Sequence, residues 1–454
     1  MNRVPRAVLL SLFCLPAAHL CAQVQIGGGT CDSTALNGNY ELLLTGRQVA
    51  ATGAISKVFH GIGVAAFDGL SKVTFTMTAN TNAAAGTPLV YSGAYSLQSN
   101  CVGTINITSG DTATFTVESF NAGKGFALSG TDATYAYTGS GNVQAGTCQT
   151  STLSGVHEFN ATGILLSGTA IAGTLDVAGV FQFDGNGNVT ASWTQASNTS
   201  TNTVSATGTY TVTAACLVAA TLTDTANNKY TVSLTIYSTV PDFALAAASP
   251  QLMFNGYGSA AQPGNNGGSC TAPMLNGTYE FFLGGRQVSP AGINLKLFQS
   301  VGTATFDGIN KVSFSLNANT NAAAGASLTY SGTYDIQSNC QGTINITSGD
   351  TATFSMVAYS VDTTTEQARS FTLVGTDANY AYNGGGNIQP VACATSTLSG
   401  LWNFSANGVT LSSSSITGSL DAAGVLQFDG QGNVTASWTE SSDTSTSTLT
   451  ATGT

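Results

Sequence analysis

Polar and apolar residues alternate along most of the chain, in short runs separated by turn residues. In one such run Tyr40, Leu42 and Leu44 share one parity, and Glu41 falls on the other. Successive side chains of a strand point to opposite faces of a sheet, so we expect the aromatic and aliphatic set to face a core and Glu41 to face solvent. Turn signals such as Asp68-Gly69 separate these runs. The pattern predicts an all-β protein.

The runs belong to a long internal repeat. Residues 31–147 reappear at 270–392, and residues 148–206 reappear at 393–451. A shorter repeat inside each copy relates the motifs Leu-x-Gly, Phe-Asp-Gly and Gly-x-Tyr, which predicts tandem domains in the order A–B–A′–B′. The expected segments are a leader at 1–22, module A at 31–147, module B at 148–258, a linker at 259–269, module A′ at 270–392 and a truncated module B′ at 393–454.

Each complete module has seven or eight predicted strands with Gly-rich turns. This number and spacing favour a small antiparallel β-barrel, with a β-sandwich as the alternative. Closing a barrel also pairs the strand edges that otherwise invite aggregation. Module B′ stops at Thr454, which aligns with Thr209 in module B. We therefore expect the sequence to be a fragment of a longer polypeptide.

The cysteines follow the modules. Two of the nine lie in the leader, and one pair per module accounts for six of the other seven, at separations of about 70 residues. The expected disulfides are Cys31–Cys101, Cys148–Cys216 and Cys270–Cys340. Cys393 is left unpaired, because its partner would lie beyond Thr454. Each closed loop would stabilise its module by about 4 kcal/mol in the chain-entropy model. Metal binding fits poorly, since the chain has no closely spaced cysteines and only three histidines.

The N-terminus has the features of a secretory signal peptide. Arg3 and Arg6 precede an apolar stretch at residues 7–15, and Ala22 offers a small residue for cleavage. A lipoprotein with Cys21 as the lipidated residue is the alternative. No later apolar run has the length of a transmembrane helix. The expected location is therefore secreted or at the cell surface.

Charge is scarce and acidic. Charged residues make up 7% of the chain, and the formal net charge is −11. Nucleic acids and anionic membranes require clustered Lys or Arg to replace counterions. The composition therefore argues against both as partners.

Catalytic constellations are missing from the sequence. Apart from His19 in the leader, the histidines are His60 and His157, whose repeat counterparts are Gln299 and Trp402. The mature chain therefore has too few histidines for Ser-His-Asp catalysis or for a metal site with several histidine ligands. The motifs of α/β-hydrolases, P-loops and zinc proteases do not occur either. We expect a non-enzyme without a cofactor, and His157 to be a packed core residue.

Three weaker candidates remain. Asp184-x-Asn186-x-Asn188 has the alternating oxygens of a calcium loop, but a hairpin turn is favoured. Arg47 and Arg286 occupy the same position in the two long repeats, near the end of a strand. Each could contact an anion or a carboxylate at a barrel mouth. The favoured interpretation is that each is a solvent-exposed residue at a strand end. Carboxylates that recur in both long repeats are the remaining enzymatic option. They are Glu41/Glu280, Asp68/Asp307, Asp111/Asp350 and Asp132/Asp377.

The succession Leu-x-Gly-x-Tyr, Phe-Asp-Gly-x-Gly-Asn-Val-Thr and Gly-Thr-Tyr-Thr-Val with a Cys soon after resembles a large group of uncharacterised secreted repeat proteins of soil bacteria. It extends over residues 31–454, and it implies export and tandem β modules without a known activity. Gly400-x-Trp402 is also similar to the opening strand of the calycin barrels, such as avidin and the lipocalins. The other modules have Tyr40, His157 and Tyr279 at that position.

These observations predict a secreted or cell-surface, non-catalytic repeat protein with a structural or adhesive role. Its specific partners are unknown, with extracellular surface components or a small ligand as the options. The alternative is that calycin-like barrels each bind a small ligand, and a carboxylate-based hydrolase ranks last.

Overall fold

The chain folds almost entirely into β-strands. The computed structural model describes residues 8–12, 31–49, 55–99, 101–144, 146–197, 200–238, 242–260, 270–288, 294–362, 365, 367–389, 394–412, 415–442 and 445–454. Its helices are 3-10 turns of three residues: η1 (Ser33–Ala35), η2 (Thr150–Thr152), η3 (Ala272–Met274) and η4 (Thr395–Thr397). Within these ranges no helix has the length and apolar character needed to cross a bilayer.

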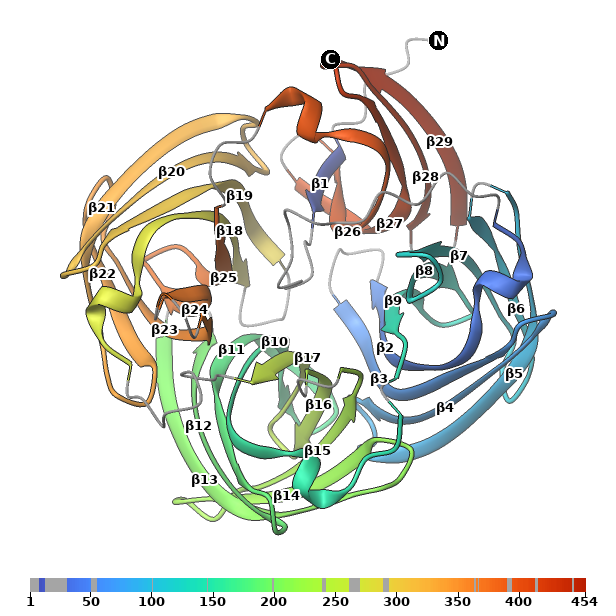
Figure 1. Cartoon of the computed structure of the whole chain (residues 1–454), viewed down its shortest axis with the longest axis horizontal. Coiled ribbons are helices and arrows are strands. Elements are labelled where there is room, and N and C mark those ends of the chain that lie inside the picture. Colours follow the sequence, from blue (N-terminus) through green and yellow to red (C-terminus); the bar gives the residue numbers. More distant parts are fainter. Residues whose placement is uncertain are drawn as a thin grey trace. The chain divides into compact units, whose positions relative to one another are not determined.

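Module A is a closed antiparallel barrel whose eight strands follow one another in chain order around the ring (Figure 1). The strands of barrel A are β2 (Asn37–Val49), β3 (Ile55–Asp68), β4 (Lys72–Thr81), β5 (Thr87–Leu97), β6 (Val102–Ser109), β7 (Ala113–Phe120), β8 (Gly125–Thr131) and β9 (Ala136–Asn142). The ring closes because β2 pairs with both β3 and β9. This up-and-down order is that of small eight-stranded barrels, whose interior is filled by side chains or holds one small ligand.

Modules B and A′ repeat the same closed ring (Figure 1). Barrel B consists of β10 (Ser154–Ser167), β11 (Ala170–Asp184), β12 (Asn188–Ser197), β13 (Ser200–Val212), β14 (Leu217–Asp224), β15 (Lys229–Ile236), β16 (Phe243–Ser249) and β17 (Leu252–Ala260). Barrel A′ consists of β18 (Asn276–Val288), β19 (Asn294–Asp307), β20 (Lys311–Thr320), β21 (Ala326–Ile336), β22 (Gln341–Ser348), β23 (Ala352–Val361), β24 (Ala368–Thr376) and β25 (Ala381–Ile388). The barrel prediction is confirmed, and the sandwich alternative is wrong.

Module B′ forms an open sheet. Its strands are β26 (Ser399–Ser412), β27 (Ser415–Asp429), β28 (Val434–Ser442) and β29 (Ser445–Gly453). The fifth strand, β1 (Val8–Leu12), pairs antiparallel with β26 and lies within the segment expected to be the leader. The module boundaries lie close to the expected ones. Barrel B extends to Ala260, two residues past the expected boundary at 258, and Cys393 lies outside the described residues.

One face of each strand supplies the barrel core. In barrel A the inward parity predicted from Tyr40, Leu42 and Leu44 is buried, together with Phe67 and Phe126. The Tyr40 ring meets the Phe67 ring edge-on with centroids 5.5 Å apart, a favourable aromatic geometry. The alternation along the sequence thus placed the core residues correctly.

One end of each barrel is closed by its 3-10 helix. In barrel A the hydroxyl of Tyr95 lies 2.8 Å from the carbonyl oxygens of Ser33 and Leu36, at the two ends of η1. Tyr210 and Tyr334 bind η2 and η3 in the same way. The tyrosine of the Gly-x-Tyr motif therefore anchors the helix that covers this end of the barrel.

A disulfide ties the same end together in each complete module. The structure contains the three bonds expected from the spacing: Cys31–Cys101, Cys148–Cys216 and Cys270–Cys340. The second cysteine of each pair has a positive φ, between 61° and 67°, in the turn before a strand. Few residues other than glycine adopt this conformation freely. The disulfide therefore holds this cysteine in a turn conformation that residues other than glycine seldom adopt.

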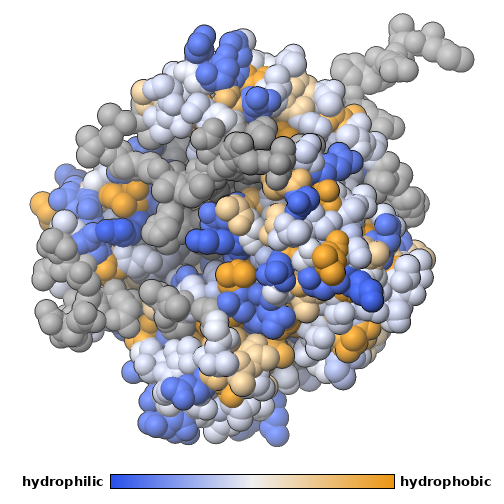
Figure 2. Space-filling view, turned by 45° about the vertical axis from the view of Figure 1, so that its right-hand side comes forward, coloured by the Kyte–Doolittle hydropathy of each residue, from blue (hydrophilic) through white to orange (hydrophobic). Residues whose placement is uncertain are grey.

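The chain divides into two compact units, residues 146–389 and residues 1–145 with 390–454. In the first unit barrels B and A′ meet through an apolar cluster of Ala178, Ala196, Val374 and Ala381. In the second unit β27 lies against β2, β7, β8 and β9 of barrel A. Both units thus join an A-type barrel to a B-type sheet. On the face shown in Figure 2, weakly polar residues predominate and apolar residues are scattered among them.

Candidate functional site

Barrel A is hollow at the end opposite its disulfide. A cavity of about 330 Å³ opens there, between the β4–β5, β6–β7 and β8–β9 turns. Its lining includes four aromatic rings and two carboxylates, from Phe59, Tyr91, Tyr135, Tyr137, Asp111 and Asp132. This volume lies at the lower end of the range of small-molecule pockets. We call this end of the barrel the mouth.

Three of the rings form a triangle at the mouth. Phe59 comes from β3, Tyr137 from β9, and Tyr135 from the turn that leads into β9. The ring centroids of Phe59 and Tyr135 lie 5.7 Å apart, and Tyr137 lies 5.6 Å from each of them. The rings are tilted or edge-on to one another. Phe59 and Tyr137 are buried, whereas Tyr135 is partly exposed.

Asp132 fixes the turn that carries two of these rings. One of its carboxylate oxygens accepts the backbone N–H of Thr134 at 2.5 Å and that of Tyr135 at 2.6 Å. The other accepts the Tyr137 hydroxyl at 2.7 Å. Burial and this hydrogen bond raise the pKa of Tyr137, so the phenol stays protonated. Both oxygens of Asp132 are therefore committed to holding the mouth in shape.

Tyr91 and Asp111 face the same cavity from β5 and from the β6–β7 turn. Burial raises the pKa of Tyr91 to about 12, and the charges of Asp111 and Asp132 add to the rise. The part of this rise that is not due to burial comes mainly from the negative charges of these carboxylates. Asp111 is exposed, and one of its oxygens accepts the backbone N–H of Thr112 at 2.7 Å.

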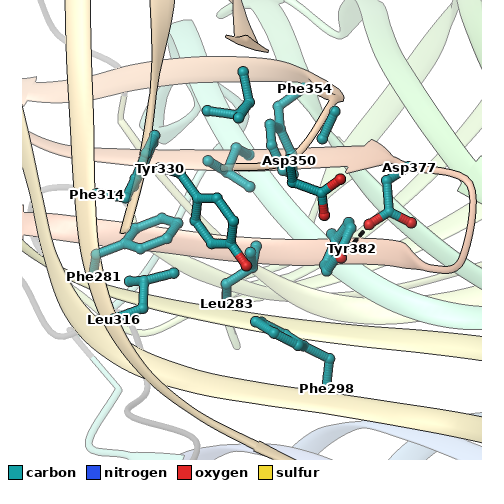
Figure 3. A pocket seen from close by; sticks show the side chains of 13 residues that line it. Phe281, Leu283, Phe298, Phe314, Leu316, Tyr330, Asp350, Phe354, Asp377 and Tyr382 are labelled. Carbon is teal, nitrogen blue, oxygen red and sulfur yellow. Dashed lines mark hydrogen bonds between the residues drawn. The ribbon is translucent and has the colours of Figure 1, made fainter. Parts of the chain in front are cut away.

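Barrel A′ builds the same mouth from equivalent residues. Figure 3 shows Asp350 and Asp377 at one end of the pocket, with Tyr330 between them and the apolar residues Phe281 and Phe314. The Asp377 carboxylate accepts the Tyr382 hydroxyl at 2.6 Å, as Asp132 does from Tyr137 (Figure 3). The Phe298, Tyr380 and Tyr382 rings form the corresponding triangle, with centroids 5.6 to 5.8 Å apart.

The two mouths differ in size. The cavity of barrel A′ has a volume of about 30 Å³, enough for one or two waters. Close to this mouth in sequence, the ammonium of Lys296 donates to the side-chain oxygen of Asn379 at 3.2 Å on the protein surface. Barrel A has Lys57 and Thr134 at these two positions. Neither residue of the bridge lines the A′ cavity.

At the equivalent end of barrel B, smaller or apolar residues replace two of the aromatic residues that line the mouth of barrel A. Strand registers place Leu175 at the position of Phe59 and Ala206 at that of Tyr91. Trp193 is fully buried in the core of B, where barrel A has Met77. Barrel B has a different Tyr–Asp pair at this end, in which the Tyr230 hydroxyl donates to Asp224 at 3.0 Å. The triangle of rings held by one aspartate is therefore the feature that barrels A and A′ share.

The structure separates the four pairs of carboxylates singled out from the sequence. Asp111 and Asp132 meet at one mouth, and Asp350 and Asp377 meet at the other. Asp68 lies at the opposite end, where it accepts the backbone N–H groups of Leu70, Ser71 and Lys72. Those bonds lower its pKa, and Asp307 repeats the arrangement. Asp68 and Asp307 are therefore turn residues.

The expectation that Glu41 faces solvent is wrong. Its side chain points away from the barrel core, as the alternation predicts, but it is fully buried. Strand β27 covers this side of barrel A, and Asn142 donates to one carboxylate oxygen at 2.9 Å. Burial raises the pKa of Glu41 to about 8. In barrel A′, Glu280 is half-buried and receives the same bond from Asn387.

The favoured interpretation of Arg286 as a solvated strand end is also wrong. Its guanidinium forms an ion pair with Asp176, which lies on β11 of the neighbouring barrel and has 2% of its side chain exposed. Burial raises the pKa of Asp176, and the arginine opposes that rise. Arg286 therefore serves the junction of two barrels and not a mouth.

The remaining candidates have structural positions. Asp184 accepts the backbone N–H groups of Asn186 and Asn188 at 2.7 and 2.9 Å, which is the predicted hairpin turn. His157 is fully buried between the rings of Phe183 and Phe243, and burial lowers its pKa to about 4. Among the described residues, no group of three or more His, Cys, Asp or Glu side chains is placed to hold a metal ion.

Sequence reasoning identified the carboxylates of the mouth but missed its aromatic residues. Tyr135-x-Tyr137 follows Asp132 closely and recurs as Tyr380-x-Tyr382 after Asp377. That recurrence was a signal, because the B-type modules lack it. Tyr91 had no signal of its own, since a tyrosine on a strand is an ordinary core residue.

Comparisons with known proteins give little help. No family model matches the chain. A search of the curated proteins found no match. Among solved structures, the intact Ap-TbpB with its N and C lobes is similar over 94% of this chain and 78% of that one, at 7% identity and a TM-score of 0.17.

Proposed function

We propose that the chain is a secreted, non-catalytic binding protein that holds a small ligand in the mouth of barrel A. The observation that carries this proposal is the cavity of about 330 Å³, lined by aromatic rings and carboxylates. Pockets of this kind combine apolar walls with a few polar groups that orient a ligand. The cavity favours the ligand-binding interpretation over a purely structural or adhesive role.

Export is supported by the three disulfides, because such bonds persist in oxidising compartments outside the cytosol. The signal peptide expected at residues 1–22 would direct this export, and its removal would take β1 out of the B′ sheet. Under this proposal the B-type modules act as structural partners of the A-type barrels.

A non-catalytic role is supported by the hydrogen bonds at the mouth. A carboxylate-based hydrolase needs one carboxyl that gives up a proton and a second that acts as base or nucleophile. Asp132 accepts three hydrogen bonds from its own turn and from Tyr137, which gives it a structural task at the mouth. Asp111 accepts one backbone N–H and is exposed.

Ligand-detected NMR can test the proposal with the full-length, disulfide-intact chain. A panel of small sugars, amines, ammonium compounds and aromatic acids is screened against the wild type and against Thr87→Trp. Thr87 lines the cavity but is itself exposed, so the new ring blocks the mouth without entering the core. Ala326→Trp at the equivalent position of barrel A′ is the matched control.

We expect at least one compound whose binding is lost in Thr87→Trp and retained in Ala326→Trp. Binding that is insensitive to Thr87→Trp, or a panel without any bound compound, would reject the mouth of barrel A as the functional site.

A further inference from the structure

Resting on that proposed function, we propose that the mouth of barrel A selects ligands with a positively charged ammonium group on a small body. The mouth combines aromatic rings with carboxylates around a cavity that is open to solvent on one side. Uncharged sugars and fatty ligands need one of these features, whereas an ammonium ion uses both.

The aromatic rings provide the first half of the argument. A cation over the face of a Tyr or Phe ring is attracted by the ring quadrupole within about 6 Å of the centroid. Tyr91 and Tyr135 are partly exposed in the cavity lining, so these are the two rings that a cation in the mouth would contact. The buried rings of Phe59 and Tyr137 lie 5.6 to 5.7 Å from Tyr135 and support it. Tyr91 lines the same cavity from another strand.

The charges provide the second half. Asp111 and Asp132 both line the cavity. Their negative charges raise the pKa of the Tyr91 hydroxyl, in addition to the larger effect of burial. Tyr330 in barrel A′ responds to Asp350 and Asp377 in the same way. The chain as a whole carries a net charge of −11, which also favours the approach of cations.

Cavity size decides which barrel is occupied. A tetraalkylammonium group needs far more room than the roughly 30 Å³ of barrel A′, but it fits within the roughly 330 Å³ of barrel A. The duplicated residues thus provide an internal comparison. Asp350 has the chemistry of Asp111 without the space, and one bound ammonium compound per chain is expected.

The test uses choline and its neutral isostere 3,3-dimethylbutan-1-ol, which has the same shape without the charge. Isothermal titration calorimetry of the full-length, disulfide-intact chain measures both, with N-acetylglucosamine as an uncharged sugar probe. We expect choline to bind about tenfold more tightly than the isostere, at one site per chain. Added salt is expected to weaken choline binding.

Variants assign the effect to single groups. Asp111→Asn keeps the oxygen that accepts the Thr112 N–H but removes the charge, and it is expected to weaken choline binding severalfold. Asp350→Asn and Asp32→Asn make the same charge change in barrel A′ and at the closed end of barrel A, and both are expected to leave binding unchanged. Thermal melts of each variant verify that the barrels remain folded.

The outcomes separate the two proposals. Equal binding of choline and its isostere, or binding of the sugar alone, with loss in Thr87→Trp, would overturn the cation inference and leave the proposed function standing. Absence of any binding sensitive to Thr87→Trp would overturn both. Equal loss in Asp111→Asn and Asp350→Asn would also contradict the cation inference, because the effect would not arise in barrel A.

Discussion

Single residues in this protein have roles that depend on which module surrounds them. Glu41 and Glu280 occupy the same position of the repeat and accept the same amide hydrogen bond, from Asn142 and Asn387. Glu41 is fully buried, whereas Glu280 is half-buried. Among the residues that the structure describes, none donates a hydrogen bond to the second carboxylate oxygen of Glu41. Burial of an unpaired carboxylate favours its protonated form, which makes Glu41 a pH-dependent element of barrel A.

Glu41 gives a prediction with a definite sign. Its pKa in the folded chain, about 8, lies above the ordinary value of 4.5, so its stabilising contribution is complete below about pH 4.5 and is lost as pH rises through 8. We expect Glu41→Gln to remove this loss, on the order of 4 kcal/mol at pH 9. Thermal melts at pH 5 and pH 9 measure it, with Glu280→Gln as control. A wild type and a Glu41→Gln variant that lose stability equally toward pH 9 would contradict this explanation.

At the scale of elements, the glycines of the repeated motifs lie where the strands require a residue without a side chain. The glycine of the Gly-x-Tyr motif crosses the next strand so closely that a Cβ atom would meet a carbonyl oxygen at 1.8 to 2.0 Å, at Gly93, Gly208 and Gly332. The glycine of the Leu-x-Gly motif has a positive φ in all four modules, between 89° and 118°. These motifs describe the barrel, and they carry no information about a ligand.

Gly208 therefore makes a clear prediction about the barrel. In Gly208→Ala the new methyl group would overlap the Thr221 carbonyl oxygen, so β13 and β14 must separate. We expect a loss of about 3 kcal/mol, near the upper end of the range for overpacked sites. Thr211→Ala, at an exposed position of the same strand, should change stability by less than about 0.5 kcal/mol. Urea unfolding followed by tryptophan fluorescence compares them, in a background with Trp402→Phe and Trp438→Phe so that Trp193 alone reports. Similar midpoints for both variants would refute the close approach.

Strands, barrel closure and disulfides were predictable, because alternation and spacing are local properties of the sequence. The mouth was only half predictable. Asp111 and Asp132 stood out by recurrence, but their proximity to Tyr91 depends on how eight strands close into a ring. The burial of Glu41 and the partner of Arg286 were not predictable, since both depend on packing between modules.

At the scale of the whole molecule, the same faces join the modules in both units. Barrel A′ meets barrel B through β18 and β23 to β25, and barrel A meets β27 through the equivalent strands β2 and β7 to β9. The junction of B and A′ contains the ion pair between Arg286 and Asp176 and a 2.7 Å hydrogen bond from Asn383 to Asn160. Pairing of an A-type with a B-type module is therefore the larger structural unit of the chain.

The ion pair allows this unit to be tested. Arg286→Met leaves Asp176 buried without its cation, which is expected to cost about 3 kcal/mol. Asp176→Asn in the same chain is expected to recover most of the loss, because the uncompensated charge disappears. Arg369→Met removes a more exposed ion pair with Asp362 and should cost less than about 1 kcal/mol. Equal losses for Arg286→Met and Arg369→Met in thermal melts would show that the junction does not rely on this pair.

The most direct test of the central claim is an experimental structure of the chain bound to the tightest compound found in the ligand screen. We predict that the compound occupies the mouth of barrel A, between Tyr91 and the rings of Phe59, Tyr135 and Tyr137, while barrel B stays filled by its own side chains. A compound found in barrel B or on an outer barrel face, with the mouth of barrel A empty, would contradict the account.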